Sequence, residues 1–412
     1  MLGQPGEQLK TAEKARGKIE KNSADSLTWE QIYTIIGKAN QQAADRCARL
    51  PREDEEKAMR DWRDGVRRVT PYVPGEQPGE SQMIKLNTNE NPYPPAPGVE
   101  RALRQLDAGT LRLYPDPEAK TLVAALAEYC GVKPSQVFVG VGSDDVLAMA
   151  FLTFFNSELP VLFPDITYSF YDVWAGLFRI PYHQIPLDNA FRIVPEDYFA
   201  DNGGIVFPNP NAPTGEEMDQ KDVERILQAN RHSVVIVDEA YVDFGAKSAL
   251  GLVEKYDNLL VVQTFSKSRS LAGLRVGFCV GSEELIRYLN EVKYSFNSYT
   301  MDRTALALGV EAVRDREYFE RTTAKIVETR EWTKIQLRRL GFRFGDSKAN
   351  FIFAAHERVQ AEKIYRALRE QHIYVRYFKK ERIDNYLRIT VGTREEMQAL
   401  FDFLESWLPT AD

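Results

Sequence analysis

The chain has 412 residues, of which 43% are hydrophobic and 27% are charged, so it can bury a large core and divide into two or three folding units. Its 53 Lys and Arg against 60 Asp and Glu give a net charge of -7, whereas non-specific nucleic-acid binding depends on a basic surface. The longest apolar run, 146–155, is interrupted by Thr153 and is too short to span a bilayer. The N-terminus is polar and does not resemble a signal sequence. We therefore expect a soluble, cytoplasmic protein with no nucleic-acid partner and no membrane segment.

The cysteines and histidines argue against metal chemistry. Cys47, Cys130 and Cys279 are far apart and form no C-x-x-C spacing, which disfavours a zinc cluster or a disulfide framework and fits a reducing compartment. The 4 histidines show no H-E-x-x-H or other metal-ligand spacing. We expect no metal site, and we expect proton transfer to use a group other than histidine.

Residues 1–69 differ from the rest of the chain and are expected to form a helical appendage. Trp29, Ile32, Tyr33 and Ile36 recur at the i, i+3, i+4, i+7 spacing of one helix face. No catalytic signature lies in this segment. A regulatory or docking helix, a brace on a dimer and a segment without a role all stay open as interpretations.

A junction rich in proline and glycine, 71–79, separates this appendage from the next segment. The polar, proline-rich stretch 87–95 follows it, and a loop of this kind can reach over a neighbouring surface. We interpret residues 70–120 as an N-terminal arm that joins a small domain.

A regular alternation of elements starts near residue 122 and indicates a large domain at 121–310. A helix is expected at 122–130 and another from Ser143 onward. Short apolar runs predict strands at 137–139, 160–163, 204–207, 233–237 and 259–264. Apolar strands separated by segments of helix length are typical of βαβ units and of a mostly parallel sheet.

The last part of the chain, 311–412, predicts a smaller α/β domain. Its expected elements are a charged helix at 316–340 that stops at Gly341, a strand at 350–354, a helix at 359–371, a strand at 386–391 and a final helix from Arg394. The predicted fold class is therefore α/β, with a large domain, a smaller C-terminal domain and a helical N-terminal appendage.

The segment 140–145 carries the first candidate site. It follows a predicted strand and opens a helix, which places free backbone N–H groups and the positive helix end where a phosphate can bind. Asp145 stands where a dinucleotide fingerprint needs its third glycine, and the chain has no G-x-x-x-x-G-K-[ST] motif for nucleoside triphosphates. Taken alone, Ser143 could be only a helix N-cap.

Two buried strands end in ionisable residues. The strand at 233–237 is followed by Asp238, and the strand at 259–264 is followed shortly by Lys267, with Arg275 eight residues further on. Ligands of open α/β sheets bind at the carboxyl ends of the strands. Asp238 could instead cap a following segment, and an isolated lysine is usually solvated. A lysine at this edge can also form a Schiff base.

A phosphate cradle, an acid and a lysine at neighbouring strand ends match the needs of pyridoxal phosphate: an anchor, a partner for the pyridine nitrogen and an amine for its aldehyde. From about residue 69 to 408 the chain resembles the aspartate-aminotransferase fold family of pyridoxal-phosphate enzymes, and within it the histidinol-phosphate aminotransferases. The resemblance rests on the runs 86–92, 113–116, 142–144, 213–215, 238–241, 266–267, 271–277 and 387–392. It implies a large sheet of the seven-stranded type between helices.

The resemblance also implies the roles of the residues around the cofactor ring. Lys267 would form the Schiff base and move the proton between Cα and C4′. Asp238 would pair with the pyridinium nitrogen, Tyr241 would hydrogen-bond the ring O3′ oxygen, and Tyr168 would stack on the ring. In most of the family an Asn precedes Pro-Thr-Gly and contacts O3′, but Ala212 stands there in this chain.

We expect Asn211 to take over the contact to O3′, with Asn209 as the alternative. For the cofactor phosphate the resemblance implies Gly142, Ser143, Asp144, Thr264, Ser266 and Arg275. Tyr114 would cross from a partner subunit to the phosphate, which would make the enzyme a homodimer. Arg388 would bind the substrate carboxylate, with Arg376 near the variable end and Asn89 in the substrate site.

These implications predict a pyridoxal-phosphate-dependent aminotransferase that takes a small-molecule amino donor and a keto-acid acceptor. Histidinol phosphate with 2-oxoglutarate, a step of histidine biosynthesis, is the leading pair. An aromatic or broad-specificity aminotransferase is an alternative, because the segment 293–299 is rich in aromatic rings. A related phospho-amino-acid decarboxylase is another. An alternative that is not an enzyme is a non-catalytic module that binds the cofactor.

Overall fold

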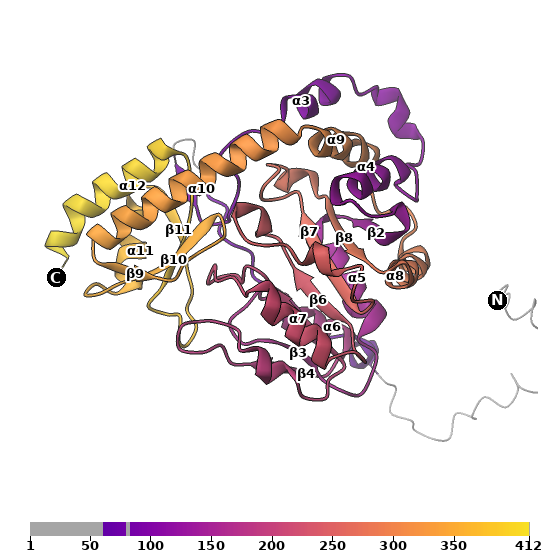
Figure 1. Cartoon of the computed structure of the whole chain (residues 1–412). Helices are drawn as coiled ribbons and strands as arrows, with labels where there is room; N and C mark the ends of the chain where they lie inside the picture. Colours follow the sequence, from indigo (N-terminus) through magenta and orange to yellow (C-terminus); the bar gives the residue numbers. More distant parts are fainter. Residues whose placement is uncertain (1–60, 80–82, 412) are drawn as a thin grey trace, which may run out of the picture. The chain divides into compact units, whose positions relative to one another are not determined.

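The computed structural model describes residues 61–79 and 83–411 (Figure 1). The chain divides into two compact units, residues 1–67 and 68–412. In the first unit only residues 61–67 are described, and they include a short 3-10 helix, Trp62–Gly65. The helix predicted around Trp29 lies outside the described residues. All strands and α-helices described below belong to the second unit.

The larger sheet of the second unit has seven strands. Their spatial order is β2 (Val137–Gly140), β8 (Gly277–Gly281), β7 (Leu259–Thr264), β6 (Val235–Asp238), β5 (Gly204–Pro208), β3 (Val161–Pro164) and β4 (Tyr182–Ile185). The strands from β7 to β4 pair in parallel, while β8 runs antiparallel to both of its neighbours. The mostly parallel sheet expected from the sequence is confirmed.

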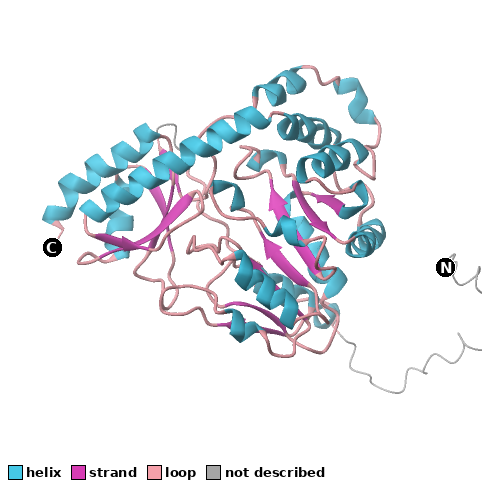
Figure 2. Ribbon diagram, in the orientation of Figure 1, coloured by secondary structure: helices cyan, strands magenta, loops and turns pink. Residues whose placement is uncertain are grey.

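Helices cover both faces of this sheet, which explains why its central strands are continuous apolar runs. Alternate residues of β6, such as Val235 and Ile236, belong to separate hydrophobic clusters. The first cluster contains side chains of α4 (Lys120–Cys130), α7 (Gln220–Ala229) and α9 (Arg303–Arg314), and the second contains side chains of α5 (Gly142–Phe154), α6 (Tyr171–Phe178) and α8 (Glu283–Phe296). Figure 2 shows helices, in cyan, packed around the strands of this sheet, in magenta.

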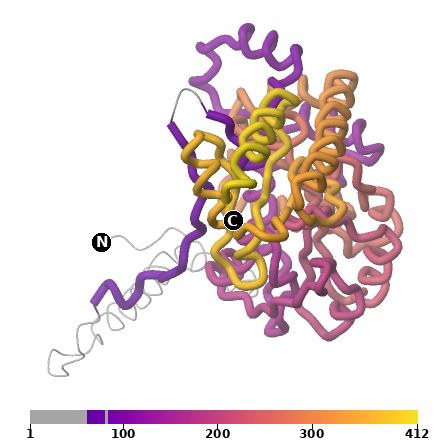
Figure 3. Tube along the Cα trace, turned by 90° about the vertical axis from the view of Figure 1, so that its left-hand side faces the viewer, coloured from indigo at the N-terminus to yellow at the C-terminus, as the bar shows by residue number. Residues whose placement is uncertain are grey.

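A second, five-stranded sheet forms a smaller lobe. Its order is β1 (Ile84–Leu86), β11 (Ile373–Tyr377), β12 (Leu387–Thr390), β10 (Phe351–His356) and β9 (Phe342–Phe344), and only β1 and β11 pair in parallel. Apolar side chains of α10 (Arg316–Arg339), α11 (Ala361–Glu370) and α12 (Arg394–Trp407) pack on it. In Figure 3 this C-terminal lobe, orange to yellow, faces the viewer.

The N-terminal arm contacts both lobes of the second unit. Its strand β1 forms an edge of the small sheet, and Val99 of the following helix, α3 (Pro97–Arg104), packs into the core of the large lobe. The boundaries at 70–120, 121–310 and 311–412 stay predictions.

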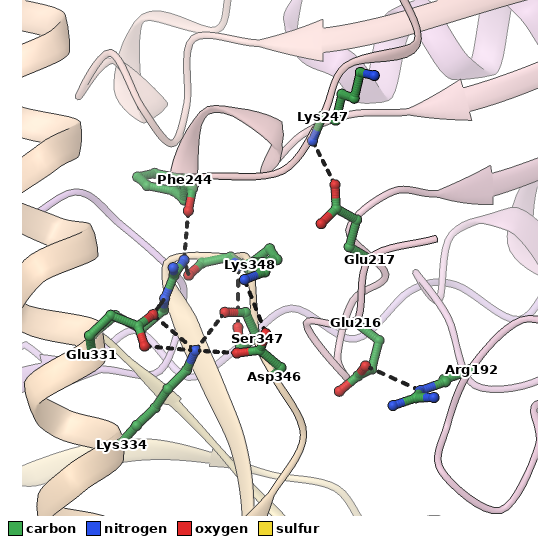
Figure 4. Close-up of polar contacts among 12 residues, drawn as sticks. Arg192, Glu216, Glu217, Phe244, Lys247, Glu331, Lys334, Asp346, Ser347 and Lys348 are labelled. Carbon is green, nitrogen blue, oxygen red and sulfur yellow. Dashed lines mark hydrogen bonds and ion pairs between the residues drawn. The ribbon is translucent and has the colours of Figure 1, made fainter. Parts of the chain in front are cut away.

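The helix α10 carries two buried cations where the lobes meet (Figure 4). Arg330 donates hydrogen bonds to the carbonyl oxygens of Phe244 at 2.6 Å and Ala349 at 3.1 Å. Lys334 donates to the Asp346 carboxylate at 2.8 Å and to the Ser347 carbonyl at 3.1 Å. Both cations are 2% exposed. Because buried charges are costly without partners, these bonds stabilise the structure here, and those of Arg330 join the large lobe at Phe244 to the small lobe at Ala349.

Within residues 61–79 and 83–411, no helix is both long enough and apolar enough to cross a membrane. The same described residues contain no group of His, Cys, Asp and Glu side chains placed to hold a metal ion.

Candidate active site

A cavity of ≈ 170 Å³ lies at the carboxyl ends of β6 and β7, next to the first turn of α5. It gathers residues that are distant in the sequence but were all predicted to belong to one site. Those that line it are Ser143, Asp144, Tyr168, Asp238, Tyr241, Thr264, Ser266, Lys267 and Arg275. Several of these residues were predicted from their positions at strand ends, and the structure brings them together at one cavity.

Hydroxyl groups, a guanidinium and a helix N-terminus meet on one side of this cavity. Arg275 donates to the Asp144 carboxylate at 3.1 Å, and its Nη1 atom lies 3.5 Å from the Ser266 hydroxyl. The Thr264 hydroxyl donates to that of Ser266 at 3.0 Å. A helix N-terminus attracts anions through its free N–H groups and its dipole. This donor set fits a phosphate group.

Gly142 allows the close approach of α5 to Arg275. It has φ +81, and a Cβ atom there would lie 2.5 Å from Arg275 Nη2. A side chain at this position would meet both backbone strain and a clash. Gly142 does not line the cavity itself, but it sets the path of the chain into Ser143.

Asp238 is the acid of the site. It is 4% exposed, and its carboxylate accepts hydrogen bonds from the Tyr171 hydroxyl at 2.9 Å and the Ala240 N–H at 3.2 Å. Burial raises the pKa of Asp238 to about 6, because removal from water penalises the charged form more than these bonds favour it. A cation bound against this carboxylate would favour its ionised form.

Lys267 extends into the same cavity. Its Nζ atom donates to the Thr88 carbonyl at 3.1 Å and lies 5.9 Å from the centroid of the Tyr241 ring. The Tyr241 hydroxyl accepts a hydrogen bond from Asn89 Nδ2 at 2.9 Å. Asn89 thus lies behind Tyr241 and does not line the cavity.

Tyr168 lines the cavity and donates its hydroxyl hydrogen to Asp144 at 2.7 Å. Burial raises the pKa of Tyr168 well above its usual value, and the neighbouring Asp144 carboxylate raises it further. The hydroxyl is therefore neutral at physiological pH and acts as a hydrogen-bond donor.

Arg388 does not line this cavity, but it has an unused donor. Its Nη2 atom donates to the Asn87 carbonyl at 2.9 Å, whereas its Nε atom is buried and has no hydrogen-bond partner among the described residues. Burial lowers the pKa of Arg388, and the nearby Arg376 adds to this effect. A buried donor without a partner is unfavourable, and an anion placed against Nε would satisfy it.

The structure gives the two asparagines near Ala212 other partners. Asn211 Nδ2 donates to the Ile166 carbonyl at 3.0 Å and to the Thr214 hydroxyl at 3.0 Å. Asn209 exchanges two hydrogen bonds with the backbone of Met218. Neither side chain lines the cavity, although Ala212 does. A contact of Asn211 with O3′ would require it to give up one of these bonds.

Two other predicted residues also lie outside the cavity. Tyr114 is 77% exposed and stacks on Tyr299 with ring centroids 4.6 Å apart. Arg376 pairs with Arg388 across β11 and β12, and its guanidinium lies 5.6 Å from the ring centroid of Phe378.

Sequence reasoning missed three residues of the site. Tyr171 holds Asp238, and Thr88 and Glu90 line the cavity. Burial alone would raise the pKa of Glu90, but hydrogen bonds from Lys85 and Thr88 lower it. Thr88 and Glu90 lie within the polar run that carried the resemblance, so that run was the available signal. For Tyr171 no motif marked the position.

Comparison with known proteins identifies the family. Residues 81–404 match the model of the family described as aminotransferase class I and II. The chain belongs to this family. Its predicted cofactor, pyridoxal phosphate, and its predicted enzyme class, a pyridoxal-phosphate-dependent aminotransferase, are thereby confirmed.

Curated relatives of this aminotransferase match over most of their length. It is 50% identical to the histidinol-phosphate aminotransferase of Lactococcus lactis subsp. cremoris over 84% of this chain and 98% of the relative. It is 54% identical to histidinol-phosphate aminotransferase 1 of Hydrogenovibrio crunogenus, again over 84% of this chain and 98% of the relative.

Solved structures share the fold of this aminotransferase. The histidinol-phosphate aminotransferase of Sinorhizobium meliloti in complex with pyridoxal-5'-phosphate is similar with a TM-score of 0.72 and 24% identity, over 78% of this chain and 90% of that one. The aspartate aminotransferase of Thermotoga maritima is similar with a TM-score of 0.71 and 21% identity, over 80% and 92% of the two chains. The predicted α/β fold class is confirmed.

Proposed function

We propose that this aminotransferase transfers the amino group of histidinol phosphate to 2-oxoglutarate. The observation that carries the proposal is the 54% identity to a relative named for histidinol phosphate, over 98% of that relative's length. The gathering of the predicted residues at one cavity supports it.

In this proposal the cofactor, when bound, supplies an electron sink for the bond that breaks at the substrate Cα atom. Lys267 would hold the cofactor through its amine and would act as the general base and acid for the proton at the substrate Cα atom. The Thr88 carbonyl, which accepts a hydrogen bond from Lys267, orients the amine. Asp238 pairs with the ring nitrogen, while Tyr171 and the Ala240 N–H hold its carboxylate in place.

The remaining cavity residues bind and orient the cofactor. Arg275, with the hydroxyls of Ser143, Thr264 and Ser266 and the first turn of α5, holds the phosphate, and Asp144 fixes Arg275. Tyr168 would stack on the ring, and Tyr241, whose hydroxyl accepts a hydrogen bond from Asn89, would donate to its O3′ oxygen. Gly142 lets the helix approach, and Asn211 supports the loop that carries Ala212.

Arg388 and Arg376 bind the anionic ends of the substrates in this proposal. Histidinol phosphate carries a phosphate and 2-oxoglutarate carries carboxylates, so both halves of the reaction bring an anion to the Nε atom of Arg388 that lacks a partner in the described structure. A planar guanidinium binds either anion in a bidentate manner.

The proposal includes a cytoplasmic homodimer. Tyr114 stands exposed and outside its own cavity, which fits a residue that completes the site of a partner subunit. Size-exclusion chromatography with light scattering tests the dimer: we expect twice the chain mass of 47.1 kDa, and a monomer that retains the cofactor contradicts this part of the proposal.

A substrate comparison tests the reaction. Purified protein with the cofactor is given 2-oxoglutarate and, separately, histidinol phosphate, phenylalanine or threonine phosphate. We expect kcat/KM for histidinol phosphate to exceed that for phenylalanine by at least about tenfold, since a hydrogen bond to a charged group such as the phosphate is worth about 1.5–3 kcal/mol and every 1.4 kcal/mol is about tenfold. Lys267→Ala is the control, and it should abolish turnover.

The other outcomes identify the alternatives. A preference for phenylalanine would make the protein an aromatic aminotransferase, and release of CO₂ from threonine phosphate would make it a decarboxylase. Cofactor bound at Lys267 without turnover of any of the three donors would contradict the proposed reaction.

A further inference from the structure

Backbone carbonyl groups at both ends of the segment 113–117 accept hydrogen bonds from side chains of the large lobe. Arg303 Nε donates to the Leu113 carbonyl at 3.0 Å, and its Nη2 donates to the Tyr114 carbonyl at 2.7 Å. One guanidinium therefore fixes two consecutive peptide groups, which the rigid fork of arginine makes possible.

Arg303 occupies a position where a cation is otherwise unfavourable. It is the first residue of α9, and a positive charge in the first turn opposes the helix dipole. The two bonds to carbonyl oxygens offset this repulsion, because those oxygens are the negative ends of peptide dipoles. The placement of Arg303 is thus explained by the segment that it holds.

A second cation holds the other end of the segment. Lys293 of α8 is 5% exposed, and its Nζ atom donates to the Pro117 carbonyl at 2.6 Å. The Tyr294 hydroxyl reaches the same carbonyl at 3.4 Å. Backbone bonds at both ends leave the segment little freedom.

The side chain of Tyr114 stays outside the protein although its backbone is fixed. It is 77% exposed and stacks on Tyr299, which is itself 44% exposed. Leu113 and Phe296, exposed by 47% and 71%, lie on the same segment and at the end of α8. An apolar group presented on a fixed backbone loses little entropy when it is covered, which is the property of a contact residue.

We propose that Arg303 is a positioning residue for the cofactor site of a second copy of this chain: it holds Tyr114 in the place from which Tyr114 reaches the cofactor phosphate in the partner subunit. The inference rests on the cofactor and the homodimer of the proposed function, but not on the identity of the amino donor. Lys293 supports it by holding Pro117. Arg303 itself touches neither substrate nor cofactor.

The first experiment measures how fast the cofactor leaves the holoprotein after dilution, followed by the absorbance of bound cofactor without any substrate. We expect Arg303→Gln to raise this rate about tenfold, as Tyr114→Phe does, because a charge-assisted hydrogen bond is worth about that factor. In the double variant the rate should rise no further. Arg366→Gln is the control, since Arg366 lies on α11 and pairs with Glu362 on the surface of the small lobe.

Hybrid dimers distinguish an effect of Arg303 on the cofactor site of the partner subunit from an effect on its own subunit. One subunit carries Lys267→Ala, so that any covalently bound cofactor belongs to the other subunit. Arg303→Gln is then placed either in the Lys267→Ala subunit or in the subunit that keeps Lys267. We expect faster cofactor loss only when the substitution lies in the Lys267→Ala subunit, with an unchanged dimer mass and an unchanged melting temperature.

The inference is overturned if the effect follows the subunit that holds the cofactor, if neither placement changes the rate, or if the effects of Arg303→Gln and Tyr114→Phe are independent. A failure of the proposed reaction is seen separately, in the substrate comparison. If the protein does not turn over histidinol phosphate but Arg303→Gln in the Lys267→Ala subunit still speeds cofactor loss from the other subunit, the positioning role of Arg303 stands.

Discussion

The chemistry of Asp238 depends on its burial more than on any single neighbour. Two hydrogen bonds favour its charged form, yet the pKa is raised to about 6 because the carboxyl group is removed from water. An acid with this pKa is partly protonated just below neutral pH. Pairing with the ring nitrogen requires the ionised form of Asp238, so the affinity for the cofactor should depend on pH around this pKa.

We expect the affinity of the cofactor-free protein for pyridoxal phosphate to fall as the pH is lowered through about 6. Below this pKa the carboxyl of Asp238 is neutral and loses its ionic attraction for the ring nitrogen. The measurement is the dissociation constant between pH 5 and 8 for the wild type and for Asp238→Asn. The cofactor's own titration is common to both proteins, so a pH profile that is identical in the two would contradict the assignment.

Glu239, the next residue, predicts a pH dependence of folding. It is 1% exposed, and its carboxylate accepts hydrogen bonds from Ser248, the Ala249 N–H and Gln263. Burial raises its pKa from 4.5 to about 7. Between pH 4.5 and about 7 the carboxyl of Glu239 is protonated in the folded chain but ionised in the unfolded chain. The free energy of unfolding therefore decreases as the pH rises from 4.5 towards 7.

We expect Glu239→Gln to remove this loss, which amounts to about 3 kcal/mol above pH 7. An uncharged amide can accept and donate in the same place, because the Ser248 hydroxyl and the Gln263 amide can reverse their roles. Unfolding by urea at pH 5 and pH 8 tests this. A variant whose stability changes with pH as steeply as that of the wild type would show that Glu239 does not titrate in this range.

At the residue scale, the sequence predicted residues that line the cavity better than the residues that hold them in place. Lys267 and Asp238 were found because each follows a buried strand, and position at a sheet edge is visible in a sequence. Tyr171, which donates to Asp238, lies in α6 far along the chain, and only the packing of that helix brings it there. The orientation of Asn211 was also beyond the sequence, since it depends on hydrogen bonds to Ile166 and Thr214.

At the scale of elements, the approach of β8 to α5 decides whether the phosphate end of the cavity forms. A Cβ atom on Gly277 would lie 2.3 Å from the backbone carbon of Gly142 and 2.3 Å from the Ser143 nitrogen. These are backbone atoms of the first turn of α5, so they cannot move aside separately. Position 277 therefore needs a glycine, because β8 and the start of α5 lie too close for a side chain.

We expect Gly277→Ala to push the start of α5 away from Arg275, to raise the dissociation constant for the cofactor at least about tenfold and to lower stability by roughly 2 kcal/mol. Gly273→Ala is the matched control in the same stretch, since a Cβ atom there meets nothing within 4 Å. Cofactor titration and urea unfolding measure both effects. Equal behaviour of the two variants would show that the contact does not limit the site.

The strands that the sequence revealed are the buried ones. The runs at 204–207 and 259–264 agree closely with β5 and β7, because burial on both faces demands unbroken apolar sequence. The edge strand β4 (Tyr182–Ile185) was missed because its side chains are mostly exposed and polar. The strand β8 was missed because glycines bound it at both ends and interrupt the apolar pattern.

At the scale of the whole second unit, two sets of contacts join the lobes on either side of the site. On one side Arg382 of the small lobe pairs with Asp165 at 2.9 Å and donates to the Leu187 and Asp188 carbonyls of the large lobe. On the other side lies the buried Arg330 of α10, which donates to the Phe244 carbonyl of the large lobe and the Ala349 carbonyl of the small lobe. Neither set was predictable from the sequence. The contacts of Arg382 join residues more than a hundred positions apart, and those of Arg330 bind backbone carbonyls that no motif marks.

The buried contact should dominate the stability of this junction. We expect Arg330→Ala to destabilise the protein by about 3 kcal/mol, because it leaves the carbonyls of Phe244 and Ala349 without their donor and opens a cavity in a buried place. Arg339→Ala, on the same helix, is the control: Arg339 is exposed and pairs with Glu405, so its loss should cost less than about 1 kcal/mol. Urea unfolding gives both values, and hydrogen exchange should show faster opening at 242–244 and at 349–351 in Arg330→Ala alone. If the two variants were equally stable, the cations of α10 would not be what joins the lobes, and the contacts of Arg382 would have to supply the junction.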